Sequence, residues 1–294
     1  MANMDDLKLL PDDQEAREWI YKAKANGFML FYDCSDFERV ELVENSADSI
    51  LKKAVLRPLQ KVVTLSKSKF NTQFSLRHVL LELQKLHKAS VHDNVLGYVG
   101  LTQEPNASNI VTVISEYADY NLRDYLSSSD LSWNEKFKLA KQLTSGLYCL
   151  HQYDMSDNIG MINGRIRLHN FGRYKKIEES KKTLAQYFEQ IPYLDPQHLK
   201  NPKEFMRDEI ISDIYSLGVL FWEISSQKIP FEEFSNEPCK LCYLIVYENH
   251  RENSVPDTPK FYEDLYKECW QFNRDSRPKT GDVWECFGSF SRRS

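Results

Sequence analysis

The segment HQYDMSDNIGMINGRIRLHNFG, residues 151–172, gathers polar side chains at spacings that could serve ion chemistry. The pair Asn163-Gly164 lies between two apolar runs and predicts a β-hairpin, because both residue types tolerate positive φ. In the second strand Ile166, Leu168 and Asn170 share one face, since strand side chains alternate with a period of two. Asn170 therefore points the same way as its apolar neighbours. Its amide oxygen is neutral and attracts a hard cation such as Mg²⁺ less strongly than a carboxylate would.

A second group with ligand chemistry is the pair Cys239 and Cys242, separated by Lys-Leu. Two thiols at this spacing could form half of a zinc site, but the sequence has no second His or Cys pair at a matching spacing. The six cysteines are scattered through a long chain without secretory features, so we expect reduced thiols and no structural metal.

The composition excludes several classes of protein. The 294 residues are 41% hydrophobic and 13% aromatic, enough for a large core or two adjoining lobes. The formal net charge is −5 and no long run of Lys or Arg occurs, so nucleic acid is not an expected partner. The sequence shows neither a signal-peptide pattern nor an apolar stretch near the roughly 20 residues of a spanning helix. We therefore expect an intracellular, cytoplasmic protein without a membrane span.

The first third of the chain is predicted to be a small sheet with a single helix. VVTL at 62–65 and NIVTVISEYA at 109–118 are rich in β-branched residues and predict strands. Between them, SLRHVLLELQKLH repeats apolar residues at helical spacing and places Glu82 at the border of the apolar stripe. A short amphipathic segment at 16–25 belongs to a polar N-terminal extension.

Helices dominate from about Leu131 onward. The segment at 133–151 has an apolar face that predicts a long amphipathic helix. The stretch SDIYSLGVLFWEI at 212–224 is apolar nearly all round, which predicts a helix enclosed by others and buried at Leu217, Val219 and Phe221.

Several short landmarks occur in a characteristic order along the chain. They are His92-Asp93-Asn94, Glu116-Tyr117-Ala118, Pro192-Tyr193-Leu194-Asp195-Pro196, Asp213-Ile214-Tyr215-Ser216-Leu217-Gly218, Cys269-Trp270 and Arg277-Pro278. In this order and spacing the chain resembles the protein kinase superfamily, in the style of its tyrosine-kinase-like serine/threonine group.

The resemblance implies an α+β fold of the bilobal protein-kinase type. It covers residues 36–290, after an N-terminal extension at 1–35. We expect a small β-rich N-lobe with one helix at about 36–115, a hinge at about 116–120 and a larger helical C-lobe at about 121–290.

Phosphoryl transfer requires a phosphate cradle and a lysine on the phosphates. The segment VELVENSADSILKKAVL contains no glycine where the glycine-rich loop should lie, and its Glu44 and Asp48 would repel a triphosphate. Aligned with the Val-Ala-x-Lys pattern of the family, Leu65 stands at the lysine position. We expect Leu65 to pack inward among apolar side chains. Lys67, two residues on and on the same strand face, is the candidate substitute and a candidate partner of Glu82.

The catalytic loop departs furthest from the family. Asn158 follows His151 after only seven residues, and neither Asp154 nor Asp157 lies five residues before it, where the His-Arg-Asp base belongs. The resemblance therefore implies a deletion that removes the base, so no catalytic residue is assigned. Asn170 replaces the aspartate of Asp-Phe-Gly, which weakens the magnesium site.

One further departure concerns stability. Asp195-Pro196-Gln197 replaces the Ala-Pro-Glu pattern of the family. The resemblance implies the loss of a carboxylate that would pair with Arg277. For Asp213 it implies a structural role, accepting backbone hydrogen bonds from the catalytic loop.

Three functions follow as alternatives. The first is a pseudokinase, a non-catalytic signalling scaffold or allosteric regulator that binds a protein partner, for example an active kinase. The second is weak ATP-dependent transfer to protein Ser, Thr or Tyr by displaced residues. The third is nucleotide sensing through the hinge backbone. The first needs no cofactor, whereas the other two need ATP and, for transfer, Mg²⁺, with weak affinity. The vestigial ATP site would comprise Lys67, Glu82, Glu116, Ala118, Asn158 and Asn170, the two asparagines being the metal ligands.

Overall fold

The computed structural model describes residues 13–27, 29–45, 49–68, 76–103, 111–118, 120–153, 159–162, 164–168, 188, 190–201 and 209–290. Their contacts divide the chain into two compact units. The first holds the described residues up to Ala118, and the second holds those from Tyr120 onward. Each unit is described by itself.

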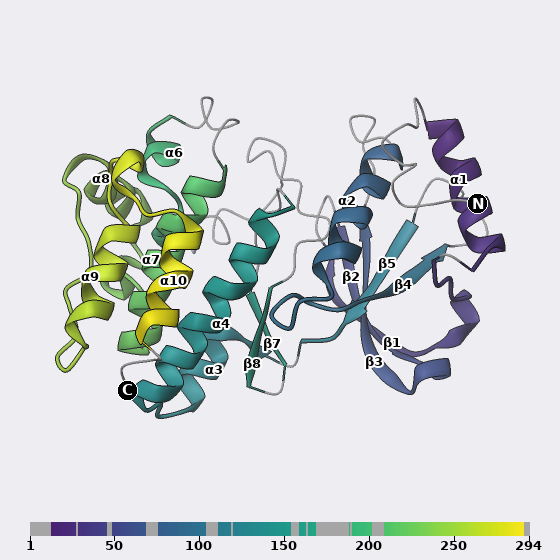
Figure 1. The fold of residues 1–294 in the computed structure, drawn as a ribbon, viewed down its shortest axis with the longest axis horizontal. Helices are drawn as coiled ribbons and strands as arrows, with labels where there is room; N and C mark the ends of the chain where they lie inside the picture. The colour runs from purple at the N-terminus through teal and green to yellow at the C-terminus, as the bar shows by residue number, and fades with distance from the viewer. Residues whose placement is uncertain are drawn as a thin grey trace. The chain divides into compact units, whose positions relative to one another are not determined.

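The first unit is built on a five-stranded antiparallel sheet (Figure 1). The strands lie in the order β1-β2-β3-β5-β4. Their bounds are β1 Phe37–Asn45, β2 Ser49–Leu56, β3 Lys61–Ser68, β4 Tyr98–Gln103 and β5 Val111–Glu116. The two runs rich in β-branched residues thus form the neighbouring strands β3 and β5, as predicted.

Two helices accompany this sheet. The helix predicted after β3 is α2, Leu76–Ala89, and α1, Asp13–Ala25, packs against it. Short 3₁₀ turns lie at Cys34–Asp36 and Arg57–Leu59. The apolar core of the unit includes a cluster of Ala54, Leu56, Val63, Leu65 and Ile114.

The second unit is mainly helical. Its long helices are α4, Trp133–His151, and α7, Glu209–Ser226, which pack against each other. α4 also packs against α10, Thr280–Phe290, and α7 packs against α9, Lys260–Cys269. The remaining segments are α3 Leu122–Ser128, α6 Pro196–Lys200, α8 Pro238–Tyr247 and 3₁₀ turns at Ile191–Tyr193, Glu232–Phe234 and Arg274–Ser276.

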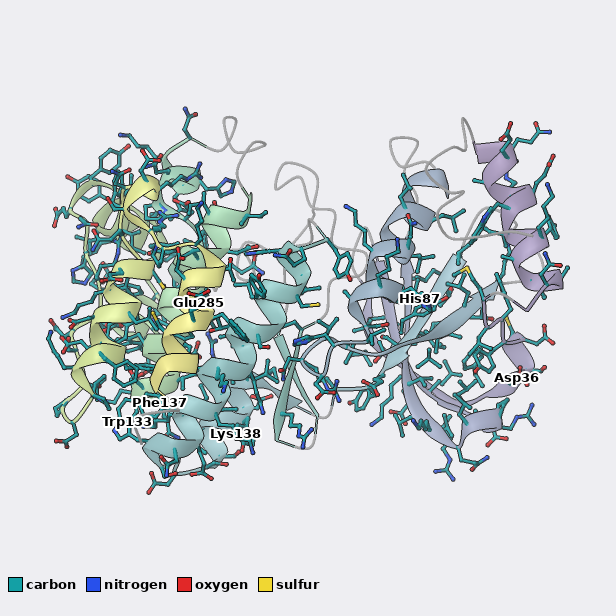
Figure 2. All side chains as sticks on the ribbon, in the orientation of Figure 1. Asp36, His87, Trp133, Phe137, Lys138 and Glu285 are labelled. Carbon is teal, nitrogen blue, oxygen red and sulfur yellow. The ribbon has the colours of Figure 1, made fainter. Side chains whose placement is uncertain are left out.

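The predicted central helix is confirmed. Leu217, Val219 and Phe221 of α7 are each no more than 1% exposed. An aromatic layer lines this core, and Trp133 and Phe137 at the start of α4 lie with ring centroids 5.5 Å apart (Figure 2). Both rings also contact Tyr262, which is fully buried.

The predicted hairpin is also confirmed. β7, Ile159–Ile162, pairs antiparallel with β8, Arg165–Leu168, and Ile162 lies opposite Arg165. Gly164 in the turn has φ +68°, a conformation that glycine adopts at little cost. A two-residue strand, β6 Tyr120–Asn121, completes this three-stranded sheet.

Candidate functional site

Leu65 occupies the β3 position at which the sequence analysis expects the family's lysine. Its side chain is 7% exposed and belongs to the apolar cluster with Ala54, Val63 and Ile114. The prediction that Leu65 packs inward is therefore confirmed. Burial of a leucine contributes about 1.5–3 kcal/mol, so at this position the strand contributes to core packing and supplies no ammonium group.

Lys67 lies two residues further along β3, opposite Ile50 on one side and Thr112 on the other. Strand alternation places it on the face of Leu65, and its side chain is half-buried. The backbone of Glu82 belongs to α2, but the Glu82 side chain lies outside the described residues. An ion pair between Lys67 and Glu82 thus stays a prediction.

The side chain of Glu116, the first residue of the predicted hinge, makes a hydrogen bond within the first unit. Its carboxylate accepts a hydrogen bond from the Gly97 N–H at 3.0 Å, and its own N–H donates to the Gly97 carbonyl at 2.9 Å. A Cβ at Gly97 would lie 2.8 Å from the Glu116 Cδ, so a larger residue would displace the carboxylate from this contact. Glu116 therefore fastens the end of β5 to the residue before β4.

A cation that the sequence analysis did not identify lies at the predicted hinge. The Lys53 ammonium of β2 lies 4.3 Å from the centroid of the Tyr117 ring. Such a contact contributes about 0.5–1 kcal/mol at an exposed site. Nothing in the local sequence indicates this pair, because the two residues are brought together only by the sheet. Ala118, the last described residue of the unit, is half-buried.

Two predicted site residues lie outside the described part of the chain, the asparagines of the predicted metal site, Asn158 and Asn170. The loop carboxylates Asp154 and Asp157, which the sequence analysis did not assign as the base, and Asp48 of the β1–β2 loop also lie outside it. The side chain of Glu44 is likewise not described. Their roles stay predictions from the sequence.

In the second unit, Asp213 of α7 contacts the last residue of α4. The Asp213 Oδ2 lies 3.0 Å from the His151 Nε2, and the His151 Nδ1 lies 2.6 Å from the Thr280 Oγ1. Burial raises the pKa of Asp213, while the hydrogen bond and charge of His151 act to lower it. Asp213 therefore joins α7 to α4 and, through His151, to the start of α10.

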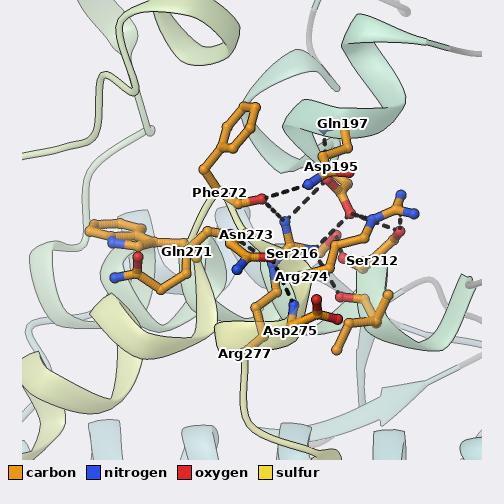
Figure 3. A network of polar contacts seen from close by, with 12 residues as sticks. Asp195, Gln197, Ser212, Ser216, Gln271, Phe272, Asn273, Arg274, Asp275 and Arg277 are labelled. Atoms are coloured by element: carbon orange, nitrogen blue, oxygen red, sulfur yellow. Dashed lines mark hydrogen bonds and ion pairs between the residues drawn. The ribbon is translucent and has the colours of Figure 1, made fainter.

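Asp195 corrects one prediction made from the sequence. The loss of the family's glutamate at Gln197 was expected to leave Arg277 without a carboxylate. Instead the Asp195 carboxylate accepts from Arg277 Nη1 at 2.7 Å and from Nη2 at 3.1 Å, with both side chains fully buried (Figure 3). A carboxylate two residues earlier in the chain thus makes the contact.

Further partners complete this network. Arg274 Nε donates to Asp195 Oδ2 at 2.9 Å, and the Ser212 hydroxyl donates to the same oxygen at 3.0 Å. Burial acts to raise the pKa of Asp195, but the hydrogen bonds and charges of the two arginines and the Gln197 N–H hold it below its ordinary value. The network joins the start of α6 to α7 and to the segment after α9.

A second polar group ties the 3₁₀ turn before α6 to α3. The Tyr193 hydroxyl donates to Glu223 Oε2 at 2.5 Å, and Arg123 donates to the Tyr193 oxygen at 2.9 Å and to Glu223 Oε1 at 3.3 Å. Burial raises the pKa of Glu223, and the Tyr193 and Arg123 contacts lower it only in part. The sequence analysis missed this group, because its members are 30 to 100 residues apart.

Within the described ranges, no three His, Cys, Asp or Glu side chains come together in a group that could hold a metal ion. Among the helices that are described, none has the length and apolar character needed to cross a bilayer.

Comparison with known proteins identifies the fold family. Residues 56–287 match the family described as protein tyrosine and serine/threonine kinase. The chain is 28% identical over 181 residues to the mixed lineage kinase domain-like protein of Mus musculus, covering 57% of this chain and 37% of that protein. It is 29% identical over 223 residues to receptor-interacting serine/threonine-protein kinase 2 of Bos taurus, covering 68% of this chain and 41% of the relative.

A more distant relative is a putative serine/threonine-protein kinase/receptor of Acanthamoeba polyphaga mimivirus. It is 25% identical over 226 residues, covering 72% of this chain and 13% of the viral protein. The matched region is less than half the length of each of these three relatives. With a family match over most of its length, an antiparallel five-stranded sheet in one unit and a helical second unit, this chain belongs to the protein kinase superfamily and carries a tyrosine-kinase-like domain.

Proposed function

We propose that this protein is a pseudokinase, a module of the kinase fold that transfers no phosphate and works as a signalling scaffold or allosteric regulator by binding a protein partner. The observation that carries the proposal is Leu65, which is buried among apolar side chains where the family's lysine is expected. A lysine at that position would hold the nucleotide phosphates, whereas leucine has no donor and no charge.

The departures in the sequence support the same function. The segment between β1 and β3 has no glycine to let backbone N–H groups approach phosphates, and the chain lacks the His-Arg-Asp sequence before Asn158. Loss of the cradle, the lysine and the base together removes positioning, charge stabilisation and proton transfer, which are the main contributions of a kinase to catalysis.

Buried polar contacts in the second unit support a stable module of the kinase fold. The Asp195–Arg277 pair, the Asp213–His151 contact and the Tyr193–Glu223 bond are all in place. A stable, well-packed module without transfer chemistry is suited to binding another protein. An active kinase is one partner class, because the module presents the same type of fold.

Nucleotide binding without transfer is the second candidate function. The hinge at Glu116–Ala118 favours it, since adenine is recognised there through backbone groups that side-chain changes elsewhere leave in place. Weak transfer by Lys67, Asn158 and Asn170 requires a metal-dependent site in addition.

A thermal-shift titration with ATP, with and without Mg²⁺, separates these functions. We expect no shift of the melting temperature for the wild-type chain. A shift independent of Mg²⁺ would favour nucleotide sensing, and a shift that requires Mg²⁺ would favour residual transfer.

Asn170→Asp sharpens the test by restoring a carboxylate at the predicted metal site. We expect this variant to bind Mg²⁺·ATP more tightly than the wild type, because Mg²⁺ prefers anionic oxygen. We expect no phosphate transfer to a generic protein substrate, because the base is still missing. An active kinase assayed in parallel is the positive control, and transfer by the wild type or by Asn170→Asp would refute the proposal.

A further inference from the structure

The N-terminal helix α1 carries a narrow apolar stripe. Ala16, Trp19, Ile20 and Ala23 recur at helical spacing and are at most 4% exposed, whereas Tyr21 on the same helix is 69% exposed. The helix packs against α2. α1 is thus a docked element of the first unit, held through one face.

The partner helix α2 is covered on two sides. Leu80 and Ala89 are both fully buried, and nine residues of helix separate their directions by about 180°. A helix lying on a single layer would bury one stripe and expose the opposite side. α2 is therefore covered from more than one side within the first unit, and α1 is one of the elements that pack against it.

The residues after α1 attach to the edge of the sheet. Phe31 forms a parallel bridge with Leu101 of β4, in which the Leu101 N–H donates to the Leu30 carbonyl at 2.8 Å and the Tyr32 N–H donates to the Leu101 carbonyl at 2.9 Å. A Cβ at Gly100 would lie 2.6 Å from the Leu30 oxygen, so the attachment depends on glycine. The bridge covers part of an edge strand that would otherwise have unpaired backbone groups.

The attached segment also packs against the apolar cluster of the sheet. Tyr32 packs against the apolar cluster that contains Leu65, Ala54 and Ile114. Leu65, which stands where the family pattern has lysine, therefore adds apolar surface to the cluster against which Tyr32 packs. Within the described part of the first unit, α2, β4 and the Leu65 cluster are all linked to residues 13–32.

We propose that residues 13–32 form a clamp that fixes the position of α2 through the packing of α1 on α2 and the bridge from Phe31 to β4. The inference rests on the proposed non-catalytic function in one respect only, which is that α2 is held without a bound nucleotide.

Hydrogen–deuterium exchange of the full chain, followed by mass spectrometry, tests the clamp. Trp19→Ala removes the largest buried side chain of α1, and we expect amide exchange in α2 to become about tenfold faster or more through local opening. Exchange in α9 of the second unit should stay unchanged. Tyr21→Ala on the exposed face of α1 is the matched control and should leave α2 as in the wild type.

A second variant keeps the test decisive if Trp19→Ala folds poorly. Gly100→Ala places a methyl group against the Leu30 carbonyl and should accelerate exchange in α2 and in β4, whereas Gly288→Ala, with no atom within 4 Å of the added Cβ, should not. Unchanged α2 exchange in Gly100→Ala would overturn the clamp, as would equal acceleration of α2 and α9.

Lys67→Met asks whether an ion pair still fixes α2. We expect the acceleration of α2 exchange in this variant to be smaller than in Trp19→Ala. Acceleration as large as that in Trp19→Ala would show that Lys67, and not the clamp, holds the helix. Because exchange is measured without nucleotide, this result is independent of the ATP titration and can fail while the pseudokinase proposal stands.

Discussion

The two units treat the family's charged contacts in opposite ways. In the first unit, the position of the β3 lysine has become Leu65, and its surroundings are apolar. In the second unit, the carboxylate expected at Gln197 is absent, yet Asp195 supplies one to Arg277. The difference is that one expected charge gives way to a buried apolar side chain, whereas the other is supplied by a carboxylate two residues earlier in the chain, within reach of the same arginine.

The contribution of the Asp195–Arg277 pair to stability can be tested directly at Asp195. Asp195→Asn leaves Arg277 buried without its carboxylate, and removal of one partner from a buried ion pair costs about 3–5 kcal/mol. We expect a loss of that size in the free energy of unfolding, measured by tryptophan fluorescence during urea titration. Asp275→Asn, at an exposed position in the neighbouring turn, is the control and should change it little.

A double variant sharpens the same point. Gln197 donates to the Phe272 carbonyl at 3.2 Å, and Arg277 also donates to that oxygen at 3.4 Å. The two side chains are therefore neighbours, and Gln197→Glu added to Asp195→Asn should recover part of the lost stability. No recovery would mean that the position of Asp195, and not merely a nearby negative charge, is required.

The second prediction concerns the apolar position. Leu65→Lys, which restores the family residue, should lower the free energy of unfolding by about 1.5–3 kcal/mol through lost apolar burial. It should restore no phosphate transfer. Leu65→Met conserves volume, and we expect a cost below about 1.5 kcal/mol. Urea titration measures both variants, and a Leu65→Lys chain as stable as the wild type would contradict a structural role for Leu65.

The third and smallest effect depends on pH and contrasts two buried acids. The pKa of Glu223 is raised, so as pH falls through that pKa the folded state takes up a proton before the unfolded state does. The wild type should therefore gain stability relative to Glu223→Gln as pH falls toward the ordinary glutamate value of 4.5. Asp195, whose pKa is lowered, should lose its contribution only as pH falls below its ordinary value of 3.8. Melting temperatures of the wild type, Glu223→Gln and Asp195→Asn, measured from neutral pH to below 3.8, test both trends. A wild type that becomes less stable relative to Glu223→Gln on acidification would contradict the first.

Local patterns were sufficient for most elements of the fold. The all-round apolar pattern predicted the buried α7, the Asn-Gly pair predicted the β7–β8 turn, and the β-branched runs predicted β3 and β5. Each of these signals lies within one segment, where periodicity or turn chemistry determines the structure.

The contacts that escaped prediction depend on distant pairings. Asp195 reaches Arg277 across 82 residues, and comparison of single positions with the family motif detected only the missing glutamate. Glu116 meets Gly97, and Leu30 meets Leu101, only after the sheet has formed. Of the candidate site, the inward position of Leu65 followed from its alignment with the lysine position of the family pattern, but the partner of a half-buried Lys67 depends on a helix whose placement no local pattern determines.

The bridge between Phe31 and Leu101 also has a consequence for biosynthesis. The apolar stripe of α1 leaves the ribosome before α2 and β4 have been made, so during synthesis it has no native surface to cover. Contacts this far apart in sequence close late and slowly, and exposed apolar helices at that stage favour association with other chains. The nascent chain should therefore depend on chaperones until about the time when residue 101 emerges.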